Sequence, residues 1–271
     1  MSKNILIIGS KGYLGKHIIR YLSSSNSVYV FNRKDIDQFI CSDKIDLKIK
    51  FDVLINCIVD YNNDSTQIIE SNFFTPIKIC QKLQKSSNFK VFHFDSFYSK
   101  FFKLSPKNSY LLSKKSLIEW TEIFHDETPG ITTFILRLEH VIGKNESKKK
   151  FNGWLLNKLK NNGSIELGPC SHSFDFIYIE DVVKAIILLI NTNRFNHKFN
   201  YFEVGSGKNY QLKTFVNLLK LKLNSESKII FNKNIQTDLY KNQSSIAKSK
   251  ELMDLGWNPK SNLNEIIDLI L

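Results

Sequence analysis

Three glycines near the amino terminus constrain the fold of this chain more than any other feature. Gly9, Gly12 and Gly15 directly follow the apolar run 4–8 and open a segment, 12–22, whose apolar residues fall on one helical face. A short apolar run that ends in glycine predicts a buried parallel strand. The strand, the glycine turn and the helix together predict the first βα unit of a parallel sheet.

The same loop predicts a site for the pyrophosphate of a dinucleotide. One glycine permits the sharp turn, a second lets the backbone approach the phosphates, and a third lets the helix pack closely on the strand. The helix amino terminus adds unpaired N–H groups and the positive end of a dipole. Glycines also occur in turns for steric reasons alone, but their place between a strand and a helix favours cofactor binding. The residues assigned to this part of the site are Gly9, Ser10, Lys11, Gly12, Tyr13, Leu14 and Gly15.

Strand and helix patterns alternate along the first half of the chain. Short apolar runs predict further strands, and amphipathic segments predict further helices between them. The expected strands are 28–31, 53–59, 91–94 and 132–138, and the expected helices are 68–83 and 108–124. This alternation predicts an α/β fold, a Rossmann-like doubly wound parallel sheet with helices on both faces.

The pattern changes after about residue 143. The segment 144–152 is polar and basic and predicts a loop, and shorter helices and strands follow it. We expect residues 1–143 to form a dinucleotide-binding domain, to which a strand and a helix return from about 174–204. Residues 144–271 are then expected to form mainly a smaller substrate-binding lobe over the carboxyl edge of the sheet, where ligands bind in such folds.

The end of the second strand indicates which dinucleotide is bound. An acidic residue there would accept the ribose hydroxyls of NAD, whereas this chain has Asn32, Arg33 and Lys34. An uncharged residue followed by two cations suits the 2′-phosphate of NADP, because arginine binds phosphate with a planar fork; Lys11 in the loop could add to this. We therefore expect NADP(H) rather than NAD(H), the alternative being that these cations are solvated surface charges. Two residues of the third apolar run complete the expected cofactor site, Cys57 and Ile58.

A tyrosine and a lysine four residues apart lie in the expected helix 108–124. This spacing places Tyr110 and Lys114 on one helical face. Reduction of a ketone needs a proton donor beside the carbon that accepts the hydride. A phenol is a weak acid, with a pKa of about 10, and a nearby ammonium lowers that pKa. The pair is weak evidence alone, but together with the glycine loop it predicts a catalytic acid, Tyr110, and its partner, Lys114, which can also bind the nicotinamide ribose.

The two motifs, in this order, resemble the extended short-chain dehydrogenase/reductases of the NAD-dependent epimerase/dehydratase superfamily. The Gly-x-x-Gly-x-x-Gly spacing is similar to the loop of this family rather than to the commoner Gly-x-Gly-x-x-Gly. Several stretches look like the CDP-abequose and CDP-paratose synthases and the dTDP-rhamnose synthases, which are nucleotide-sugar 4-ketoreductases. These stretches are Asn32–Asp37, Asp95–Phe97, Tyr110–Trp120, Leu138–Gly143, Asp175–Val183 and Leu255–Pro259.

The resemblance implies a reaction and its setting. It implies NADPH-dependent reduction of a nucleotide-activated 4-keto-(6-deoxy)sugar, with the hydride from the nicotinamide and the proton from Tyr110. The product would enter deoxysugar biosynthesis for a surface polysaccharide such as a lipopolysaccharide O-antigen. The 4,6-dehydratases that resemble this family carry an Asp-Glu pair, whereas Asp95 is followed here by Ser96. Elimination is therefore not expected, and plain ketone reduction is.

Four positions depart from the family pattern or depend on it. The Ser or Thr that bonds the substrate oxygen falls on Phe94, so Ser96, two residues later, is our candidate replacement; the alternative is that Ser96 only caps a turn. The arginine that meets the substrate diphosphate is replaced by Phe174. His140 lies where the family often has an Asn facing that phosphate, and we assign it to the substrate site, the alternative being a packed histidine. Asn72 matches an Asn that holds the active-site helix, and we group it with the substrate-binding residues, although in isolation it would be a solvated helix residue.

Three other functions stay open. A 4-epimerase that retains NAD would use the same tyrosine and lysine, but Asn32 and Arg33 argue against NAD. A non-catalytic NADP-binding sensor of the same fold would account for Phe94 and Phe174. A nucleic-acid binder is suggested by the net charge of +12 alone. The lysines are dispersed and form no basic helix, so no nucleic-acid partner is expected.

The remaining expectations concern the setting and the assembly of the protein. The four cysteines show no metal-ligand or paired spacing, which predicts no metal site and suits a reducing cytoplasm. No signal peptide or membrane-spanning run is visible, so no membrane partner is expected. The resemblance implies a homodimer formed through the helices at about 66–85 and 108–125, whose outer faces would have to be apolar.

Overall fold

The structure is a computed structural model that describes residues 2–41, 49–61, 64–83, 85–104, 108–235 and 244–271. The chain divides into two compact units. The first unit comprises Met1–Phe102, Pro106–Arg137 and Ile186–Phe202. The second unit comprises Lys103–Ser105, Leu138–Ala185 and Glu203–Leu271.

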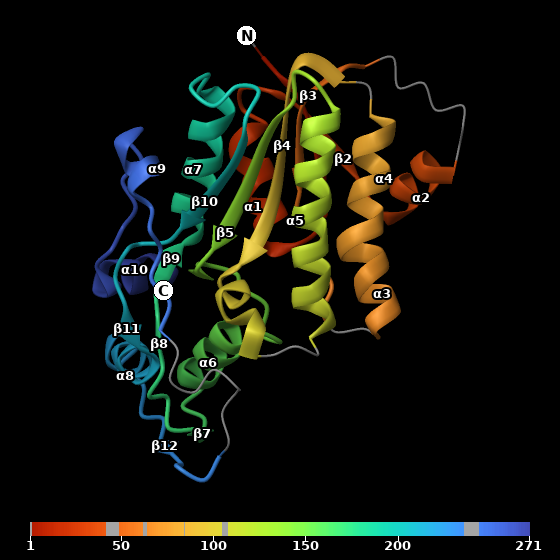
Figure 1. The fold of residues 1–271 in the computed structure, drawn as a ribbon. Helices are drawn as coiled ribbons and strands as arrows, with labels where there is room; N and C mark the ends of the chain where they lie inside the picture. Colours follow the sequence, from red (N-terminus) through yellow and green to blue (C-terminus); the bar gives the residue numbers. More distant parts are fainter. Residues whose placement is uncertain (1, 42–48, 62–63, 84, 105–107, 236–243) are drawn as a thin grey trace. The chain divides into compact units, whose positions relative to one another are not determined.

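A six-stranded sheet is the framework of the first unit (Figure 1). Its strands are β1 (Asn4–Ile8), β2 (Ser27–Phe31), β3 (Phe51–Asn56), β4 (Lys85–Ser96), β5 (Thr132–Leu138) and β10 (Phe199–Val204). Their order across the sheet is β10-β5-β4-β3-β1-β2. Strand β1 pairs in parallel with both β2 and β3, and β3 pairs in parallel with β4. Parallel strands that are joined through helices confirm the predicted Rossmann-like α/β fold.

Helices pack against the apolar faces of this sheet. They are α1 (Tyr13–Leu22), α2 (Arg33–Cys41), α4 (Thr75–Lys82) and α5 (Ser109–Glu127). Helix α3 (Ser65–Ile69) contacts α5, and α7 (Ile179–Asn191) belongs to the first unit from Ile186 onward. Alternate strand residues point to opposite faces, and on one face Leu6 and Leu54 pack with Phe39 of α2, Ile79 of α4 and Phe124 of α5. Figure 1 shows α5 in front of the strands and α1 behind them. Burial on both faces explains why the strands read as continuous apolar runs.

Two elements of the first unit differ from the expectation drawn from the sequence. Helix α2 was not expected; it begins with a reciprocal cap, in which the Asp35 amide donates to Asn32 Oδ1 (3.2 Å) and the Asn32 amide donates to Asp35 Oδ2 (2.8 Å). The expected strand 53–59 is wrong at its end, because β3 ends at Asn56. The Asn56 side chain accepts a hydrogen bond from the amide of Ile58 (3.1 Å), which turns the chain out of the strand.

The second unit consists of short paired strands and helices. Strand β6 (His140–Ile142) pairs with β9 (Phe176–Tyr178), β7 (Ile165–Leu167) with β12 (Ile229–Phe231), and β8 (Ser173–Phe174) with β11 (Tyr210–Gln211). Its helices are α6 (Phe151–Lys160), α8 (Leu212–Lys222), α9 (Lys250–Asp254) and α10 (Leu263–Ile270). The polar loop expected over 144–152 is therefore shorter, since α6 begins at Phe151. In the described parts of both units, no helix is long and apolar enough to cross a membrane.

Candidate active site

The glycine loop between β1 and α1 has the geometry of a phosphate-binding turn. Gly9 has a φ of +77°, and the amide of Gly12 donates to its carbonyl oxygen (3.0 Å). A Cβ on Gly9 would lie 2.4 Å from the backbone carbon of Cys57, and one on Gly15 would lie 2.6 Å from the Gly9 oxygen, so both positions require glycine. Among the described residues, no side chain caps the amino terminus of α1. Its N–H groups therefore fit an anion such as a dinucleotide pyrophosphate.

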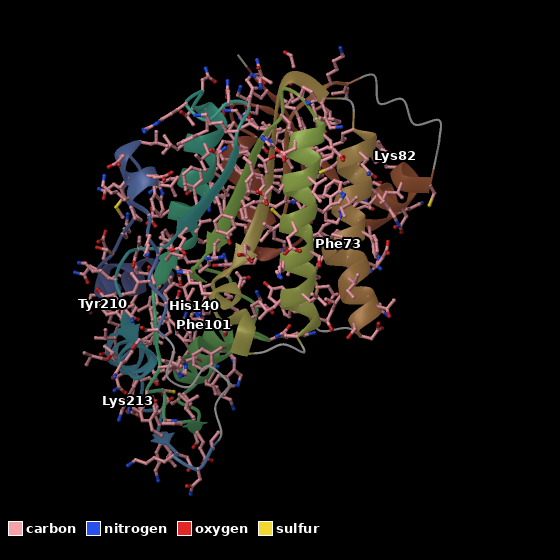
Figure 2. All side chains as sticks on the ribbon, viewed as in Figure 1. Phe73, Lys82, Phe101, His140, Tyr210 and Lys213 are labelled. Carbon is pink, nitrogen blue, oxygen red and sulfur yellow. The ribbon has the colours of Figure 1, made fainter. Side chains whose placement is uncertain are left out.

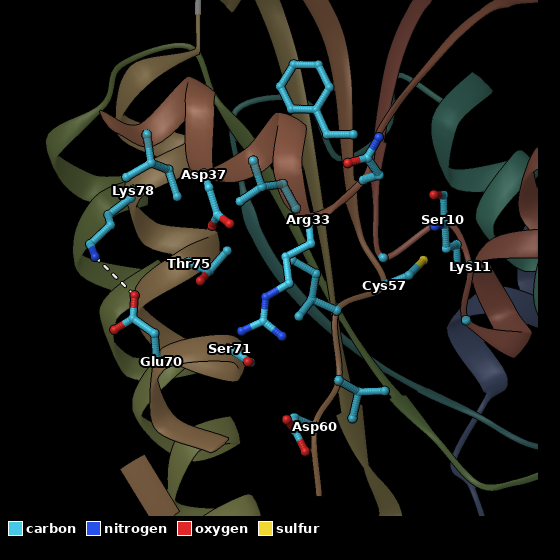
Figure 3. A pocket seen from close by; sticks show the side chains of 18 of the residues that line it. Ser10, Lys11, Arg33, Asp37, Cys57, Asp60, Glu70, Ser71, Thr75 and Lys78 are labelled. Carbon is cyan, nitrogen blue, oxygen red and sulfur yellow. Dashed lines mark hydrogen bonds and ion pairs between the residues drawn. The ribbon is translucent and has the colours of Figure 1, made fainter. Parts of the chain in front are cut away.

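A cavity of about 440 Å³ opens beside this loop. It is lined by Gly9–Gly12, by the ends of β2 and β3, by α2 and by the segment that leads into α4. Figure 3 shows Arg33 reaching into the cavity from α2, while Lys11 lies at the glycine loop on the opposite side. Among the side chains drawn there, the marked ion pair joins Lys78 and Glu70 (3.1 Å) and does not involve Arg33 or Lys11. Both cations are thus placed to meet a phosphate.

The structure places the expected cofactor residues in two groups. Those that line the cavity are Gly9, Ser10, Lys11, Gly12, Asn32, Arg33, Cys57 and Ile58. Those that do not are Tyr13, Leu14, Gly15, Lys34, Tyr110 and Lys114. Gly15 acts through close packing of α1, and Lys34 is exposed outside the cavity lining. Several lining residues were missed. Ile36, Asp37 and Ile40 belong to α2, which was not expected, and the others follow β3 or lie in the segment through α4, namely Asp60, Glu70, Ser71, Thr75 and Lys78.

Tyr110, Lys114 and Ser96 come together in the first unit. Helix α5 begins at Ser109, with the Asn108 side chain accepting from the amide of Leu111 (3.2 Å), and it presents Tyr110 and Lys114 one turn apart. Tyr110 is hydrogen-bonded to the side chain of Ser96, the last residue of β4, which comes directly after a run of buried residues. Phe94 is buried in the strand. A serine hydroxyl therefore lies beside Tyr110, two residues after Phe94.

The pKa of Tyr110 moves in the opposite direction to our expectation. Burial raises it to about 12, while the hydrogen bond with Ser96 lowers it and the charge of Asp95 raises it further. We expected Lys114 to lower this pKa; the net shift is nevertheless upward, because burial outweighs the interactions that lower it. A phenol with a raised pKa keeps its proton at neutral pH. This arrangement holds the proton that a donor must deliver.

Lys114 is a buried ammonium whose charge depends on its neighbours. Its exposed fraction is 4%, and burial lowers its pKa to about 8, whereas the nearby Asp95 and Cys57 raise it. Burial raises the pKa of Cys57 itself to about 12, so this thiol stays neutral. His93 is also buried nearby. The side-chain nitrogen of Asn56 donates to Nδ1 of His93 (3.0 Å), and burial lowers the pKa of His93 to about 3. Asp95 is therefore the carboxylate that supports the charge of Lys114.

Asp95 lies at the end of β4 with a fully buried side chain. Its Oδ2 accepts hydrogen bonds from Arg137 Nε (3.1 Å) and from the hydroxyl of Tyr201. Its Oδ1 accepts from the hydroxyl of Ser99 in the 3-10 turn Phe97–Leu104. The guanidinium of Arg137 also lies over the Tyr201 ring, 4.8 Å from its centroid. Our sequence reasoning gave Asp95 no role, because its partners come from distant strands.

Asn72 lies in a π-helical turn, Glu70–Phe74, between α3 and α4. It is fully buried, so the description of it as a solvated helix residue is wrong. Its amide nitrogen donates to the carbonyl of Asp60 (2.7 Å) and to Ser113 Oγ (3.1 Å), and its oxygen accepts from the Asp60 amide (2.7 Å). Ser113 in turn donates to the carbonyl of Tyr110 (2.7 Å). The Asn72 side chain thereby ties the loop after β3 to the first turn of α5.

His140, labelled in Figure 2, belongs to the second unit, where it packs against two aromatic rings. Its ring stacks on Phe174 with centroids 4.6 Å apart and meets the edge of Phe176 at 5.1 Å. Asn152 donates to its Nε2 (3.4 Å), and burial lowers its pKa to about 4. The two departures from the family pattern, His140 and Phe174, are thus in contact with each other, and the imidazole is neutral at physiological pH.

Comparison with known proteins places this geometry in a family. Residues 5–205 match the NAD dependent epimerase/dehydratase family. The chain is 26% identical to a CDP-abequose synthase from Salmonella muenchen, over 100% of this chain and 98% of the relative. It is 24% identical to a putative UDP-glucose 4-epimerase from Methanocaldococcus jannaschii, over 98% of this chain and 97% of the relative.

A solved structure shows the same fold. The structure of RMD from Pseudomonas aeruginosa, complexed with NADPH, superposes with a TM-score of 0.79 at 17% sequence identity. The match covers 100% of this chain and 98% of the other. At this identity the likeness concerns the fold alone, and it agrees with the six-stranded parallel sheet of the first unit.

Proposed function

This chain belongs to the NAD dependent epimerase/dehydratase family and is an NAD(P)-dependent enzyme of the oxidoreductase type, and from that premise we propose that it is an NADPH-dependent reductase of a nucleotide-activated 4-keto-(6-deoxy)sugar. The observation that carries this proposal is the hydrogen bond between Tyr110 and Ser96. It supplies a proton donor and a second hydroxyl at one place, although Phe94 occupies the usual hydroxyl position. The full-length similarity to a CDP-abequose synthase supports a sugar nucleotide as substrate.

In the proposed mechanism, three side chains of the protein have separate roles. The reduced nicotinamide, when bound, supplies the hydride. Tyr110 delivers its proton to the substrate oxygen, and Ser96 holds that oxygen at hydrogen-bond distance from the phenol. Lys114 keeps a positive charge beneath the site, which stabilises the negative charge that Tyr110 acquires on giving up its proton.

Reduction is favoured over elimination by the surroundings of Asp95. A dehydratase of this family needs an acid after this position, and the chain has Ser96 there. The carboxylate of Asp95 is itself fully buried and engaged by Arg137, Tyr201 and Ser99. Both of its oxygens are therefore occupied by donors of the protein itself.

The preference for NADP(H) rests on the cations of the cofactor cavity. Arg33 points into the cavity from α2, and Lys11 lies at the glycine loop (Figure 3). At the end of β2, where an acid would accept the ribose hydroxyls of NAD, Asn32 instead caps α2. We assign Arg33 to the 2′-phosphate of NADP, because a guanidinium binds phosphate with two parallel hydrogen bonds.

Two further residues act around the substrate in this proposal. Asn72 is a positioning residue, since its polar atoms hold the loop after β3 and the start of α5 rather than facing a ligand. His140 contributes a neutral imidazole to the substrate-binding unit, in place of the family's Asn. Phe174 stacks on it where the family has an arginine. In this proposal the nucleotide therefore contacts the rings of His140 and Phe174, where the family has an asparagine and an arginine.

A homodimer is also part of the proposal. Helix α5 exposes Leu112 (47%) and Ile123 (56%), and the neighbouring turn exposes Phe74 (44%). Large apolar side chains of this kind support the expected pairing through α4 and α5. Sedimentation equilibrium of the wild type and of Ile123→Asp tests it; a monomeric wild type would contradict it.

A direct assay tests the function. The purified protein is titrated with NADPH and NADH by fluorescence, and then CDP-, dTDP-, UDP- and GDP-4-keto-6-deoxysugars are added while the absorbance of the reduced nicotinamide is followed. Preferential binding of NADPH and its oxidation with one keto-sugar is the expected result. Retention of NAD on purification, with interconversion of 4-epimers, would instead support the second candidate, a 4-epimerase, which the similarity to the Methanocaldococcus jannaschii relative favours. Binding of neither dinucleotide would overturn both.

A further inference from the structure

The end of β4 is braced by side chains from two other strands of the sheet. Asp95 receives Arg137 Nε from β5 (3.1 Å) and the hydroxyl of Tyr201 from β10, both on Oδ2. These three strands lie side by side in the order β10-β5-β4. The ring of Tyr201 also carries the guanidinium of Arg137 on its face. The carboxylate is thus held from one side by neighbouring strands.

The other oxygen of Asp95 holds the segment that follows the strand. Ser99, in the 3-10 turn, donates to Oδ1. Inside the same turn the amide of Tyr98 donates to Ser96 Oγ (3.3 Å). Ser96, which meets Tyr110, therefore lies between two anchored points, Asp95 before it and Ser99 after it. Loss of the Asp95 carboxylate would release both ends of this short segment.

The negative charge of Asp95 also acts on the two proposed catalytic residues of α5. Its influence reaches Lys114 and Tyr110 on α5, whereas Arg137 and Tyr201 face it from β5 and β10. Two other titratable groups that interact with Lys114 are neutral, because burial raises the pKa of Cys57 to about 12 and lowers that of His93 to about 3. Asp95 is accordingly the anion that balances the buried ammonium.

We propose that Asp95, clamped by Arg137, Tyr201 and Ser99, is a positioning residue of the reductase site, which fixes Ser96 against Tyr110 and keeps Lys114 positively charged. The assignment of a role in turnover rests on the proposed reductase function. The effect on Lys114 does not, because it can be measured without a substrate. Arg137 and Tyr201 act through the carboxylate and touch neither substrate nor cofactor in this proposal.

The principal experiment replaces the carboxylate by its neutral isostere in the full chain, Asp95→Asn. The pKa of Lys114 is measured by NMR of protein labelled with [ε-¹³C]lysine, with the signal assigned by its loss in Lys114→Met. In Asp95→Asn this pKa should fall below its wild-type value of about 8, because the anion that raises it is gone. The alkaline limb of the kcat profile should move to lower pH by the same amount. A shift of one pH unit lowers the rate on that limb by about tenfold.

A matched control distinguishes this role from general stabilisation. Asp175→Asn removes another buried carboxylate, one that accepts from Ser206, Gly207 and Ala247 in the second unit. It should leave the Lys114 pKa and the alkaline limb where they are in the wild type. An unchanged Lys114 pKa in a folded Asp95→Asn protein overturns the proposal. If no keto-sugar is turned over by the wild type, the proposed function fails while the NMR measurement still decides the role of Asp95.

A second variant covers the case in which Asp95→Asn does not fold. Tyr201→Phe removes one donor from the carboxylate but keeps its charge, and Tyr201 is partly exposed. It should lower kcat several-fold at every pH, with the NADPH dissociation constant and the alkaline limb unchanged. A wild-type kcat in Tyr201→Phe would show that the clamp does not position Ser96.

Discussion

Each of the two units buries a carboxylate, but the donors that bind the two carboxylates differ in kind. In the first unit, Asp95 accepts hydrogen bonds from a guanidinium, a phenol and a serine hydroxyl. In the second unit, Asp175 accepts from the backbone amides of Ser206, Gly207 and Ala247 and from the Ser206 hydroxyl. Both side chains are removed from water. What differs is whether the partners carry charge.

The difference teaches what each carboxylate is for. Burial raises the pKa of Asp175, while four hydrogen bonds lower it, so this group ties loops together without acting on any cation. Asp95 instead acts on Lys114 and Tyr110. In the low-dielectric interior of a protein, a buried carboxylate shifts the pKa values of ionisable groups near it. In our proposal the first unit thus holds the catalytic groups, whereas Asp175 holds loops of the second unit through uncharged donors.

The largest expected effect tests whether the buried groups of the first unit carry the chemistry. Tyr110→Phe removes the proton donor but keeps the ring that packs against Tyr61 (centroids 6.1 Å apart). We expect kcat/KM to fall by about 10²- to 10⁴-fold, the usual contribution of a general acid. NADPH affinity, measured by fluorescence titration, should be unchanged. A variant that retains most of its activity would remove Tyr110 from the mechanism.

A smaller effect is expected at the cofactor cavity of the same unit. Arg33→Ala removes the guanidinium that points into the cavity. Loss of charge-assisted hydrogen bonds to a 2′-phosphate should raise the NADPH dissociation constant by about 10- to 100-fold. The NADH dissociation constant should hardly change, since NADH lacks that phosphate. Lys34→Ala, at an exposed neighbour outside the cavity lining, is the control and should bind NADPH like the wild type. Equal weakening for both dinucleotides would contradict the assignment.

The pH dependence of the wild type compares the two units directly. Lys114 has a pKa lowered to about 8, so its charge is present below that pH and is lost as the pH rises through it. The kcat/KM profile should therefore fall on the alkaline side. His140 of the second unit has a pKa lowered to about 4 and is neutral throughout the range above it. No limb is thus expected between about pH 5 and 7, where an ordinary histidine titrates. A limb there that disappears in His140→Gln would contradict a neutral imidazole.

The smallest expected effect is one of stability in the second unit. Asp175→Asn leaves several buried donors with poorer acceptors, which should lower the free energy of unfolding by about 1–3 kcal/mol. Thermal unfolding followed by circular dichroism measures this loss. The surface pair of Lys250 and Asp254 (2.6 Å) offers a control, since Asp254→Asn should cost well under 1 kcal/mol. If both variants lost the same free energy of unfolding, the buried hydrogen bonds of Asp175 would stabilise the protein no more than a surface ion pair does.

Much of the fold could be predicted from local pattern. Strand β5 spans the expected residues, Thr132–Leu138, because a run of β-branched and apolar residues identifies a buried strand. Helix α2 was missed; it begins at the reciprocal cap between Asn32 and Asp35, and its apolar residues Ile36 and Phe39 are buried. The end of β3 was misplaced because apolar residues continue past Asn56 into the loop. Cues of this kind concern hydrogen bonds that composition does not reveal.

The sequence by itself determined the parallel α/β class, the phosphate-binding turn and the pairing of Tyr110 with Lys114 on one helical face. Each of these depends on residues within a few positions of one another, where backbone geometry allows few alternatives. The tertiary structure alone decided that Ser96 meets Tyr110, that Asn72 braces α5 and that Asp95 is clamped. The partners of Asp95 lie 42 and 106 residues away, at Arg137 and Tyr201. Contacts of such separation arise from the order of strands in the sheet, which no local spacing in the chain encodes.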